Sequence, residues 1–384
     1  MEVRPYQQCT ACVMDTSDCD ISFDACGVCN HHLEYLQKSR YACSPEDRTR
    51  KLEAAAARIR ESRGAKQYDC VLGLSGGLDS SYLALLAHRL GLRPLAIHLD
   101  NGWNSELAVD NIQKIVQKLK LDLKTVVLDW ETFRELQLAF LKASVANVEV
   151  PTDHAIFASL YRSAAAEGLQ FVLSGNNIAT ESILPPSWGY NFMDLRHIKS
   201  IHHRFAKRPL GDYPTLSLPR YLYYRYLKRI QKIPLLNYVD FNKKIAIQEL
   251  QSEFGWRDYG CKHGESRFTR FFQGYILPKK FGFDKRRAHY SSLIVSGQMT
   301  RGEALELLKY PPLAETELNI ERQYVLKKLE LSEQEFTEIM KQAPKRAEEY
   351  PSNAGLLKIF AQLKREKLQK NLGSYVPQID QASL

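Results

Sequence analysis

Between residues 68 and 175 the sequence alternates short apolar runs with longer amphipathic segments. The apolar runs are typical of strands and span residues 69–74, 93–100, 123–129 and 170–175. The segments between them have helical spacing and span residues 78–91, 105–120, 130–144 and 152–168. Strands that alternate with helices of about 10–15 residues form a parallel sheet with right-handed crossovers. The sequence therefore predicts an α/β fold that binds its ligand at the carboxyl ends of the strands.

The remainder of the chain lacks this alternation. Residues 196–232 hold ten Lys/Arg and one acid, and from residue 242 onward the patterns are mostly helical, with a charged helical segment at about 315–370. We expect four regions: a Cys-rich module at 1–44, a connecting helix at 45–66, the sheet domain at 67–240 and a helical C-terminal region at 241–384. The C-terminal region is expected to complete the site for the molecule on which the sheet domain acts, the acceptor.

A glycine-rich turn joins the first expected strand to the first helix. Its sequence, "LSGGLDSS", would place backbone N–H groups and a helix N-terminus at one point, which is a geometry that binds anions. The lysine of a phosphate-transferring P-loop is absent, so the turn suits a departing pyrophosphate better than γ-phosphate transfer. Asp79 fits an anion site if Mg²⁺ bridges it to the phosphates. The predicted ATP and pyrophosphate contacts here are Leu74, Ser75, Gly76, Gly77, Asp79, Ser80 and Ser81.

The "SGGLDSS" stretch resembles the SGGxDS motif of the ATP-pyrophosphatases, or PP-loop enzymes, which have a Rossmann-like fold of the HUP type. The resemblance implies cleavage of ATP between the α and β phosphates, adenylation of a carbonyl oxygen, and displacement of AMP by a nitrogen or sulfur nucleophile. A second stretch, "LSGNNIATES" at 173–182, is similar to a segment of NAD synthetase-like members. It implies roles for Glu181 in catalysis and in magnesium binding with Asp79, for Gly175 and Asn176 at ATP, and for Asn177 and Thr180 at the acceptor. In the same family the strand end at "HLDNGWNSE" (98–106) lies beside the adenosine, which implies a role for Asp100 at ATP and for Asn101 at the ribose or acceptor.

The most specific resemblance lies at residues 260–301, which carry nine Lys/Arg and two acids. Their runs "KHGESRFT" and "DKRRAH", with the cysteine pairs, resemble bacterial N-acetyl sugar amidotransferases of lipopolysaccharide O-antigen and nonulosonic acid synthesis over about residues 7 to 310. The family implies that ATP adenylates the N-acetyl group of a UDP-linked acetamido sugar, a uronate, and that ammonia then gives an acetamidino sugar. The candidate residues are Lys262 and Arg287 for catalysis, Arg267, Arg286 and His289 for substrate binding, and His263 and His289 for proton transfer.

Five of the eight cysteines fall within the first 29 residues. The pairs Cys9/Cys12 and Cys26/Cys29 form two CxxC turns, which can wrap four thiolates around one zinc ion. An iron centre is the alternative, and His31 and His32 are possible substitute ligands. Four protein ligands leave no open position, so the predicted zinc is structural.

The ammonia source is expected to be a separate protein. Residue 2 is Glu rather than a nucleophilic cysteine, and the remaining cysteines, at 19, 43, 70 and 261, lack the setting of a glutaminase nucleophile. The resemblance implies a glutaminase subunit and a cyclase-like barrel subunit as partners, with free ammonia as a substitute in vitro.

Charge and hydropathy bound the alternatives. The net charge of +9 favours anionic partners, and no apolar run approaches the ~20 residues that span a bilayer. With no secretory signal in "MEVRPYQQC", we expect a cytoplasmic protein. The alternative enzyme is a zinc-ribbon PP-loop tRNA thiolation protein, favoured by the basic, aromatic run at 220–229 but lacking a CxxC pair in the sheet domain. A non-catalytic zinc-ribbon adaptor is the remaining alternative.

Overall fold

A five-stranded parallel sheet lies at the centre of the computed structural model, which describes residues 4–39, 44–188 and 191–355. The strand order is β3-β2-β1-β4-β5, and every neighbouring pair is parallel. The strands are β1 Cys70–Gly73, β2 Pro94–Asp100, β3 Leu123–Val127, β4 Phe171–Leu173 and β5 Gln231–Ile233. The predicted α/β class is confirmed. The edge strand β5 was not predicted, because three residues inside a basic segment show no strand periodicity.

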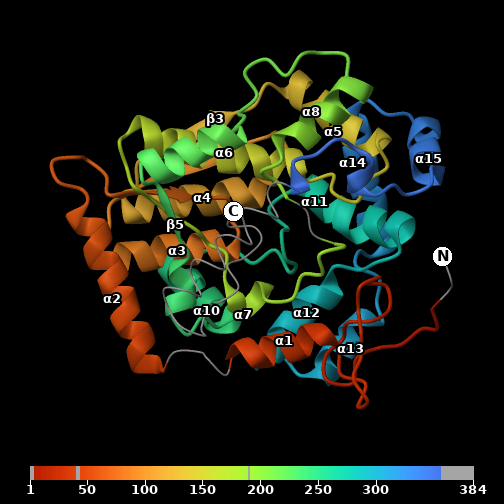
Figure 1. Ribbon diagram of the computed structural model, residues 1–384, viewed down its shortest axis with the longest axis horizontal. Coiled ribbons are helices and arrows are strands. Elements are labelled where there is room, and N and C mark those ends of the chain that lie inside the picture. The colour runs from red at the N-terminus through yellow and green to blue at the C-terminus, as the bar shows by residue number, and fades with distance from the viewer. Residues whose placement is uncertain (1–3, 40–43, 189–190, 356–384) are drawn as a thin grey trace.

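Helices cover both faces of this sheet (Figure 1). Alternate residues of β1 point to opposite sides, so Leu72 packs in one core cluster and Val71 in another. The first cluster includes residues of α2 Pro45–Glu61, α3 Leu78–Arg89, α4 Glu106–Leu119 and α10 Lys243–Phe254. The second includes residues of α6 Val150–Ala166 and α9 Leu218–Leu222. A sheet covered on both faces leaves the ends of its strands for ligand binding.

The strand order reverses at β1. The chain runs outward from β1 to β2 and β3, then returns through α5 Trp130–Lys142 and α6 to β4 on the other side of β1. In such sheets the crevice beyond the carboxyl ends of the strands at the reversal is the usual ligand site. The loop after β1 carries the Ser75-Gly76-Gly77 turn, and the loop after β4 carries Gly175. The two loops therefore meet at this crevice.

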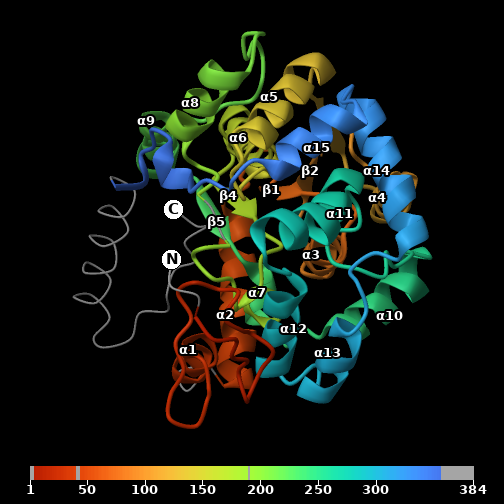
Figure 2. The ribbon, with the colours of Figure 1, turned by 90° about the vertical axis from the view of Figure 1, so that its right-hand side faces the viewer.

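The N-terminal module packs against the C-terminal region. Its helix α1 Asn30–Ser39 contacts α12 Arg286–Val295, and Figure 2 shows both beside α13 Arg301–Leu308. The other described elements are α7 Ile178–Glu181, α8 Leu195–Phe205, η1 Tyr223–Leu227, η2 Leu235–Tyr238, α11 Arg267–Phe271, the π-helix η3 Phe272–Phe281, α14 Glu315–Leu329, α15 Glu333–Lys341 and η4 Ala347–Glu349. Helices α14 and α15 confirm the expected helical segment in part, and its residues 356–370 lie outside the described residues.

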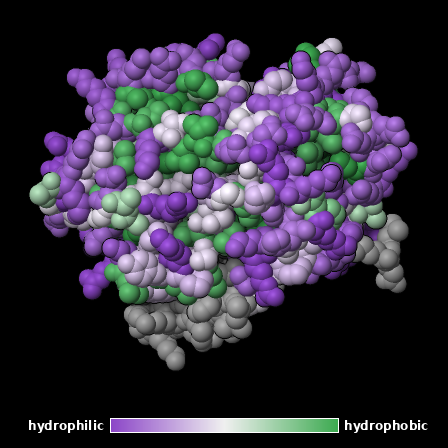
Figure 3. Space-filling view, turned by 90° about the horizontal axis from the view of Figure 1, so that it is seen from above, coloured by the Kyte–Doolittle hydropathy of each residue, from purple (hydrophilic) through white to green (hydrophobic). Residues whose placement is uncertain are grey.

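The surface mixes polar and apolar residues, as the face drawn in Figure 3 shows. Among the residues that the structure describes, no helix combines the length and the apolar character needed to span a membrane.

Candidate active site

The glycine turn after β1 is held in a fixed shape by its neighbours. Gly76 has a φ of +81°, and a Cβ there would lie 2.7 Å from the backbone oxygen of Ala108. Its carbonyl accepts hydrogen bonds from Trp256 Nε1 at 3.0 Å and from the Tyr259 hydroxyl at 2.9 Å. Only glycine combines this left-handed backbone with such close contact. The turn is therefore rigid before any ligand reaches it.

The start of α3 offers N–H groups at the same point. The N-cap is Gly77, so no side chain caps the first turn. Ser75 orders the turn: its N–H donates to Ser80 Oγ at 3.2 Å, and its hydroxyl accepts from the N–H of Gly77 at 3.3 Å. A helix N-terminus of this kind attracts anions through its N–H groups and its dipole.

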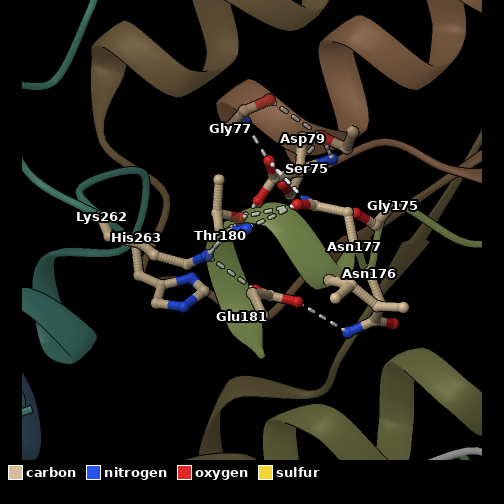
Figure 4. Close-up of polar contacts among 12 residues, drawn as sticks. Ser75, Gly77, Asp79, Gly175, Asn176, Asn177, Thr180, Glu181, Lys262 and His263 are labelled. Carbon is tan, nitrogen blue, oxygen red and sulfur yellow. Dashed lines mark hydrogen bonds and ion pairs between the residues drawn. The ribbon is translucent and has the colours of Figure 1, made fainter. Parts of the chain in front are cut away.

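The two carboxylates predicted to bind magnesium lie together, one from each loop (Figure 4). Asp79 is in the first turn of α3 and Glu181 ends α7. The ammonium of Lys262 lies 2.8 Å from Glu181 Oε1 and 3.6 Å from Asp79 Oδ2. It also donates to the Thr180 hydroxyl at 3.3 Å. One cation thus joins the loop after β1, the loop after β4 and the C-terminal segment.

Adjacent asparagines orient these carboxylates. Asn177 donates to Asp79 Oδ1 at 3.2 Å, and its own carbonyl oxygen caps α7 by accepting from the N–H of Thr180. Asn176 donates to Glu181 Oε2 at 3.2 Å. The loops can approach so closely because a Cβ on Gly175 would lie only 3.3 Å from the backbone carbon of Asp79.

The electrostatics favour a bound cation at this point. Burial raises the pKa of Asp79, and the charge of Glu181 adds to this effect against that of Lys262. Burial also opposes ionisation of Glu181, but the charge and hydrogen bond of Lys262 outweigh it and lower the pKa to about 2. Both side chains remain accessible, with exposed fractions of 24% and 27%. Asp79 and Glu181 are accessible and both contact the ammonium of Lys262, so their oxygens are also placed to bind a magnesium ion, which takes oxygen ligands.

A loop from the C-terminal segment covers the glycine turn, and sequence reasoning missed several of its residues. Besides Trp256 and Tyr259, it brings the carboxylate of Glu265 against Gly77, where a Cβ would lie 2.7 Å from Glu265 Oε1. The backbone here is fixed to the loop after β2, because the N–H of Ser105 donates to the Glu265 carbonyl at 2.8 Å. These contacts join residues far apart in sequence, so no local motif announces them.

Two histidines beside Lys262 have opposite electrostatic surroundings. The imidazole of His263 lies 3.9 Å from Glu265 Oε1, and this carboxylate outweighs burial to raise the pKa of His263. Burial, together with the charges of Lys262 and His263, holds the pKa of His289 well below its usual range. The two rings are 5.9 Å apart between centroids. Two imidazoles whose pKa values are shifted in opposite directions therefore lie next to one another, an arrangement suited to proton transfer.

Four other residues that were predicted to contact ATP or the acceptor lie in the strand ends and the helix that surround the glycine turn. Leu74 and Ser81 are buried, with exposed fractions of 2% and 0%. Asp100 Oδ1 accepts from the N–H of Gly102 at 2.9 Å, which fixes the turn after β2. The side chain of Asn101 donates to Thr152 Oγ1 at 3.2 Å. Leu74 and Ser81 thus shape the site without an exposed surface, whereas Asp100 stands at a strand end on the ligand side of the sheet.

The three predicted arginines make contacts away from the glycine turn. The guanidinium of Arg267 lies 2.9 Å from Glu321 and 3.5 Å over the ring of Tyr324. Arg286 binds Asp284 at 2.7 Å, and its guanidinium also donates to the carbonyls of Leu307 and Tyr310.

Arg287 contacts the N-terminal module instead. Its Nε lies 2.9 Å from Asp15 Oδ2, and it donates to the carbonyl of Val13 at 3.0 Å. All three arginines thus join parts of the protein to one another, and the structure does not bring them to the carboxylates of Asp79 and Glu181.

Three of the four predicted metal-binding thiols form one group in the N-terminal module. Cys9, Cys12 and Cys29 are buried, and their sulfur atoms all lie within 4.8 Å of one another. Hydrogen bonds from the thiols of Cys12 and Cys29, with backbone N–H groups, hold the pKa of the Cys9 thiol far below its usual range. A buried, hydrogen-bonded thiolate among further thiols fits a zinc ion.

Cys26 lies outside this group. It is exposed, and the carboxylate of Asp24 accepts the N–H groups of both Cys26 and Val28, which fixes the turn. His31 contacts Asp18 at 2.7 Å instead. Within the part of the chain that the structure describes, three of the four ligands that the spacing predicts are therefore gathered.

Two family models match different parts of the chain. Residues 69–166 match the family model described as queuosine biosynthesis protein QueC, and residues 265–364 match that described as LPS biosynthesis protein WbpG-like, C-terminal domain. The predicted resemblance to PP-loop enzymes is confirmed. The uncharacterized protein MJ1599 of Methanocaldococcus jannaschii is 22% identical over 238 residues, which cover 55% of this chain and 78% of that protein.

Solved PP-loop synthetases give weaker likenesses. NMN synthetase from Francisella tularensis is 16% identical, covering 76% of this chain and 98% of that chain at a TM-score of 0.36. The NH3-dependent NAD synthetase from Campylobacter jejuni subsp. jejuni NCTC 11168 is 16% identical, covering 79% and 99% at a TM-score of 0.32. At these TM-scores the likeness carries no conclusion about substrate or activity.

Proposed function

We propose that this protein is the synthetase subunit of an ATP-dependent, AMP- and pyrophosphate-forming amidotransferase. The observation that carries the proposal is the convergence of Asp79, Glu181 and Lys262 on the glycine turn that lacks a P-loop lysine. The match of residues 265–364 to the WbpG-like C-terminal domain supports a sugar acceptor in surface polysaccharide synthesis. We propose a UDP-linked acetamido sugar, a uronate, as the acceptor.

The proposed reaction has two steps. The oxygen of the N-acetyl group attacks the α-phosphorus of ATP, and pyrophosphate leaves. Ammonia then attacks the carbon of the resulting imidate, loses a proton and expels AMP, which carries away the former amide oxygen. An acetamido group becomes an acetamidino group, and the activation is needed because an amide oxygen is a poor leaving group.

The residues of the site have distinct proposed roles in these steps. The N–H groups around Gly77 bind the departing pyrophosphate, as do those at other helix N-termini. Asp79 and Glu181 would hold a magnesium ion, which neutralises phosphate charge when bound. Lys262 stabilises negative charge at the same point, and the neighbouring imidazoles of His263 and His289 transfer the proton that ammonia loses. Ammonia is delivered by a partner glutaminase through a cyclase-like barrel subunit.

An assay with purified protein, ATP, Mg²⁺, isotopically labelled ammonia and a panel of UDP-acetamido sugars tests the proposal. We expect AMP and pyrophosphate in equal amounts, and the label in an acetamidino product. Asp79→Ala abolishes this turnover, whereas Glu306→Gln, a neutralisation on the exposed face of α13, leaves it unchanged. Release of ADP and phosphate, or full turnover by Asp79→Ala, would contradict the proposal.

The thiolation alternative rests on a different observation. The basic run at 220–229 exposes the rings of Tyr223 and Tyr226 by 42% and 66%. Exposed aromatic and basic side chains suit RNA. Against it, the only cysteine of the chain between Cys70, buried in β1, and the C-terminus is Cys261. Steeply salt-dependent binding of tRNA with transfer of sulfur would favour this alternative over the amidotransferase.

A further inference from the structure

The carboxylate of Glu265 lies in the part of the glycine turn where a pyrophosphate would bind. It is close enough to Gly77 that a Cβ there would be 2.7 Å from one carboxylate oxygen and 3.2 Å from the other. The Ser75 hydroxyl lies 3.5 Å from the same carboxylate. Gly77 and the Ser75 hydroxyl both belong to the turn that would hold the anion, so Glu265 and a bound phosphate would compete for one position.

Lys262, three residues earlier in the same loop, supplies the opposite charge at the adjacent position. Its ammonium bridges Glu181 and Asp79, the two carboxylates that would bind a metal ion. One short loop therefore places a carboxylate at the anion position and a cation at the metal position. The pair has the charge arrangement of a magnesium ion next to a phosphate.

The side chain of Glu265 has room to leave this position while its backbone stays fixed. The Glu265 carbonyl accepts from the N–H of Ser105, and an isolated β-bridge joins Ser266 to Asn104, so the backbone is anchored to the loop after β2. The side chain is 18% exposed, and Nδ1 of His263 lies 3.9 Å from Glu265 Oε1 as an alternative partner. A rotation of the side chain toward His263 would clear the space beside Gly77 and the Ser75 hydroxyl.

We propose that Glu265 acts as an internal competitor of the pyrophosphate group and thereby sets the affinity of the protein for ATP. This inference rests on the proposed function, because it requires that the glycine turn bind the phosphates. The competition has a direct consequence: an anion must displace a carboxylate of like charge, and Lys262 must yield the carboxylates to a divalent cation. Metal and polyphosphate therefore displace the pair together more readily than either does alone.

Removal of the Glu265 charge should consequently strengthen binding, which is the opposite of what loss of a ligand-binding residue causes. For Glu265→Gln we expect a Kd for pyrophosphate with Mg²⁺ that is lower by roughly tenfold at low ionic strength, because one like charge at contact distance is removed. The gain should shrink in high salt, which screens charges that are partly exposed. Glu265→Ala should show a gain of the same sign.

Isothermal titration calorimetry of the full chain with pyrophosphate, with and without Mg²⁺, tests this inference without any sugar or ammonia. Glu306→Gln is the matched control, since it removes the same charge on the exposed face of α13. Tighter binding by both Glu265 variants and wild-type affinity in the control support the proposal. Unchanged or weaker binding by Glu265→Gln overturns it. If the wild-type protein itself binds no pyrophosphate with Mg²⁺, the proposed function fails first, which separates the two failures.

Discussion

Lys262 and Arg287 belong to the same basic segment and were predicted to share a catalytic role, yet they face different parts of the molecule. Lys262 stands on the loop that crosses the carboxyl ends of β1 and β4, and its ammonium contacts Glu181. Arg287 stands at the start of α12, and its guanidinium contacts Asp15 of the N-terminal module. The basic character of a segment therefore indicates that anionic groups lie nearby. Whether these groups belong to a bound substrate or are carboxylates of the protein depends on where the fold places each basic residue.

Removing Lys262 is the strongest test of the difference between the two residues. We expect Lys262→Met to lower the rate of pyrophosphate release by about 100- to 1,000-fold, because a preorganised charge at the reacting phosphate is lost. Without Mg²⁺ the melting temperature should also fall, since Asp79 and Glu181 then repel each other, and added Mg²⁺ should restore it. Rates and thermal melts measured beside Lys309→Met, an exposed lysine of an i,i+3 pair, check both effects. A near-normal rate would remove Lys262 from the active site.

Removal of Arg287 should affect stability rather than ATP use. Asp15 is buried, with an exposed fraction of 2%, and the variant Arg287→Leu leaves it without its cationic partner. Loss of one partner of a mostly buried pair is expected to cost about 2–3 kcal/mol, somewhat below the cost in a fully buried pair. The expected result is a lower melting temperature and, for protein loaded with zinc, faster loss of zinc to a chelator, with the KM for ATP unchanged. A raised KM with unchanged stability would return Arg287 to the catalytic group.

The nucleotide side of the molecule was predictable because its signals are local. A strand, a glycine turn and a helix follow one another directly at Ser75, and the Asn177–Glu181 segment has the same form after β4. Parallel topology then brings the two turns together, since both follow carboxyl ends of neighbouring strands. The gathering of Asp79 and Glu181 was thus contained in the sequence pattern.

The covering loop was not predictable in the same way. Trp256, Tyr259 and Glu265 reach the glycine turn across roughly half of the chain, and each has an ordinary structural interpretation in its own segment. The basic residues of 260–301 could not be sorted either, because guanidinium groups serve ion pairs and phosphates equally well. For Cys26, spacing indicated a fourth ligand, but the Asp24 cap holds its turn with the side chain exposed.

The smallest effect concerns pH, and it is needed to interpret any pH profile of the Lys262 site. His154 is fully buried in α6. Its Nδ1–H donates to the Phe192 carbonyl at 2.6 Å, and its Nε2 accepts from the N–H of Leu216 at 3.1 Å. Burial lowers the pKa of His154 from 6.5 to about 4, against the hydrogen bond to Phe192. The folded protein therefore holds His154 neutral, and the stability this contributes is complete above pH 6.5 and is lost as the pH falls toward 4.

Between about pH 8 and pH 5.5 this difference in pKa corresponds to a loss of about 1.4 kcal/mol of unfolding free energy. In His154→Gln the same acidification should cost less by that amount, although the variant is weaker at pH 8, whereas the exposed His203→Gln should keep the wild-type slope. Urea unfolding at both pH values measures the difference. The activities of the wild type and of His154→Gln are then compared over the same pH range. If both lose activity equally on acidification while His154→Gln stays folded, the loss of activity arises in the site around Lys262 and His263. Equal slopes of stability in wild type and His154→Gln would instead show that His154 is not the group that acid must protonate on unfolding.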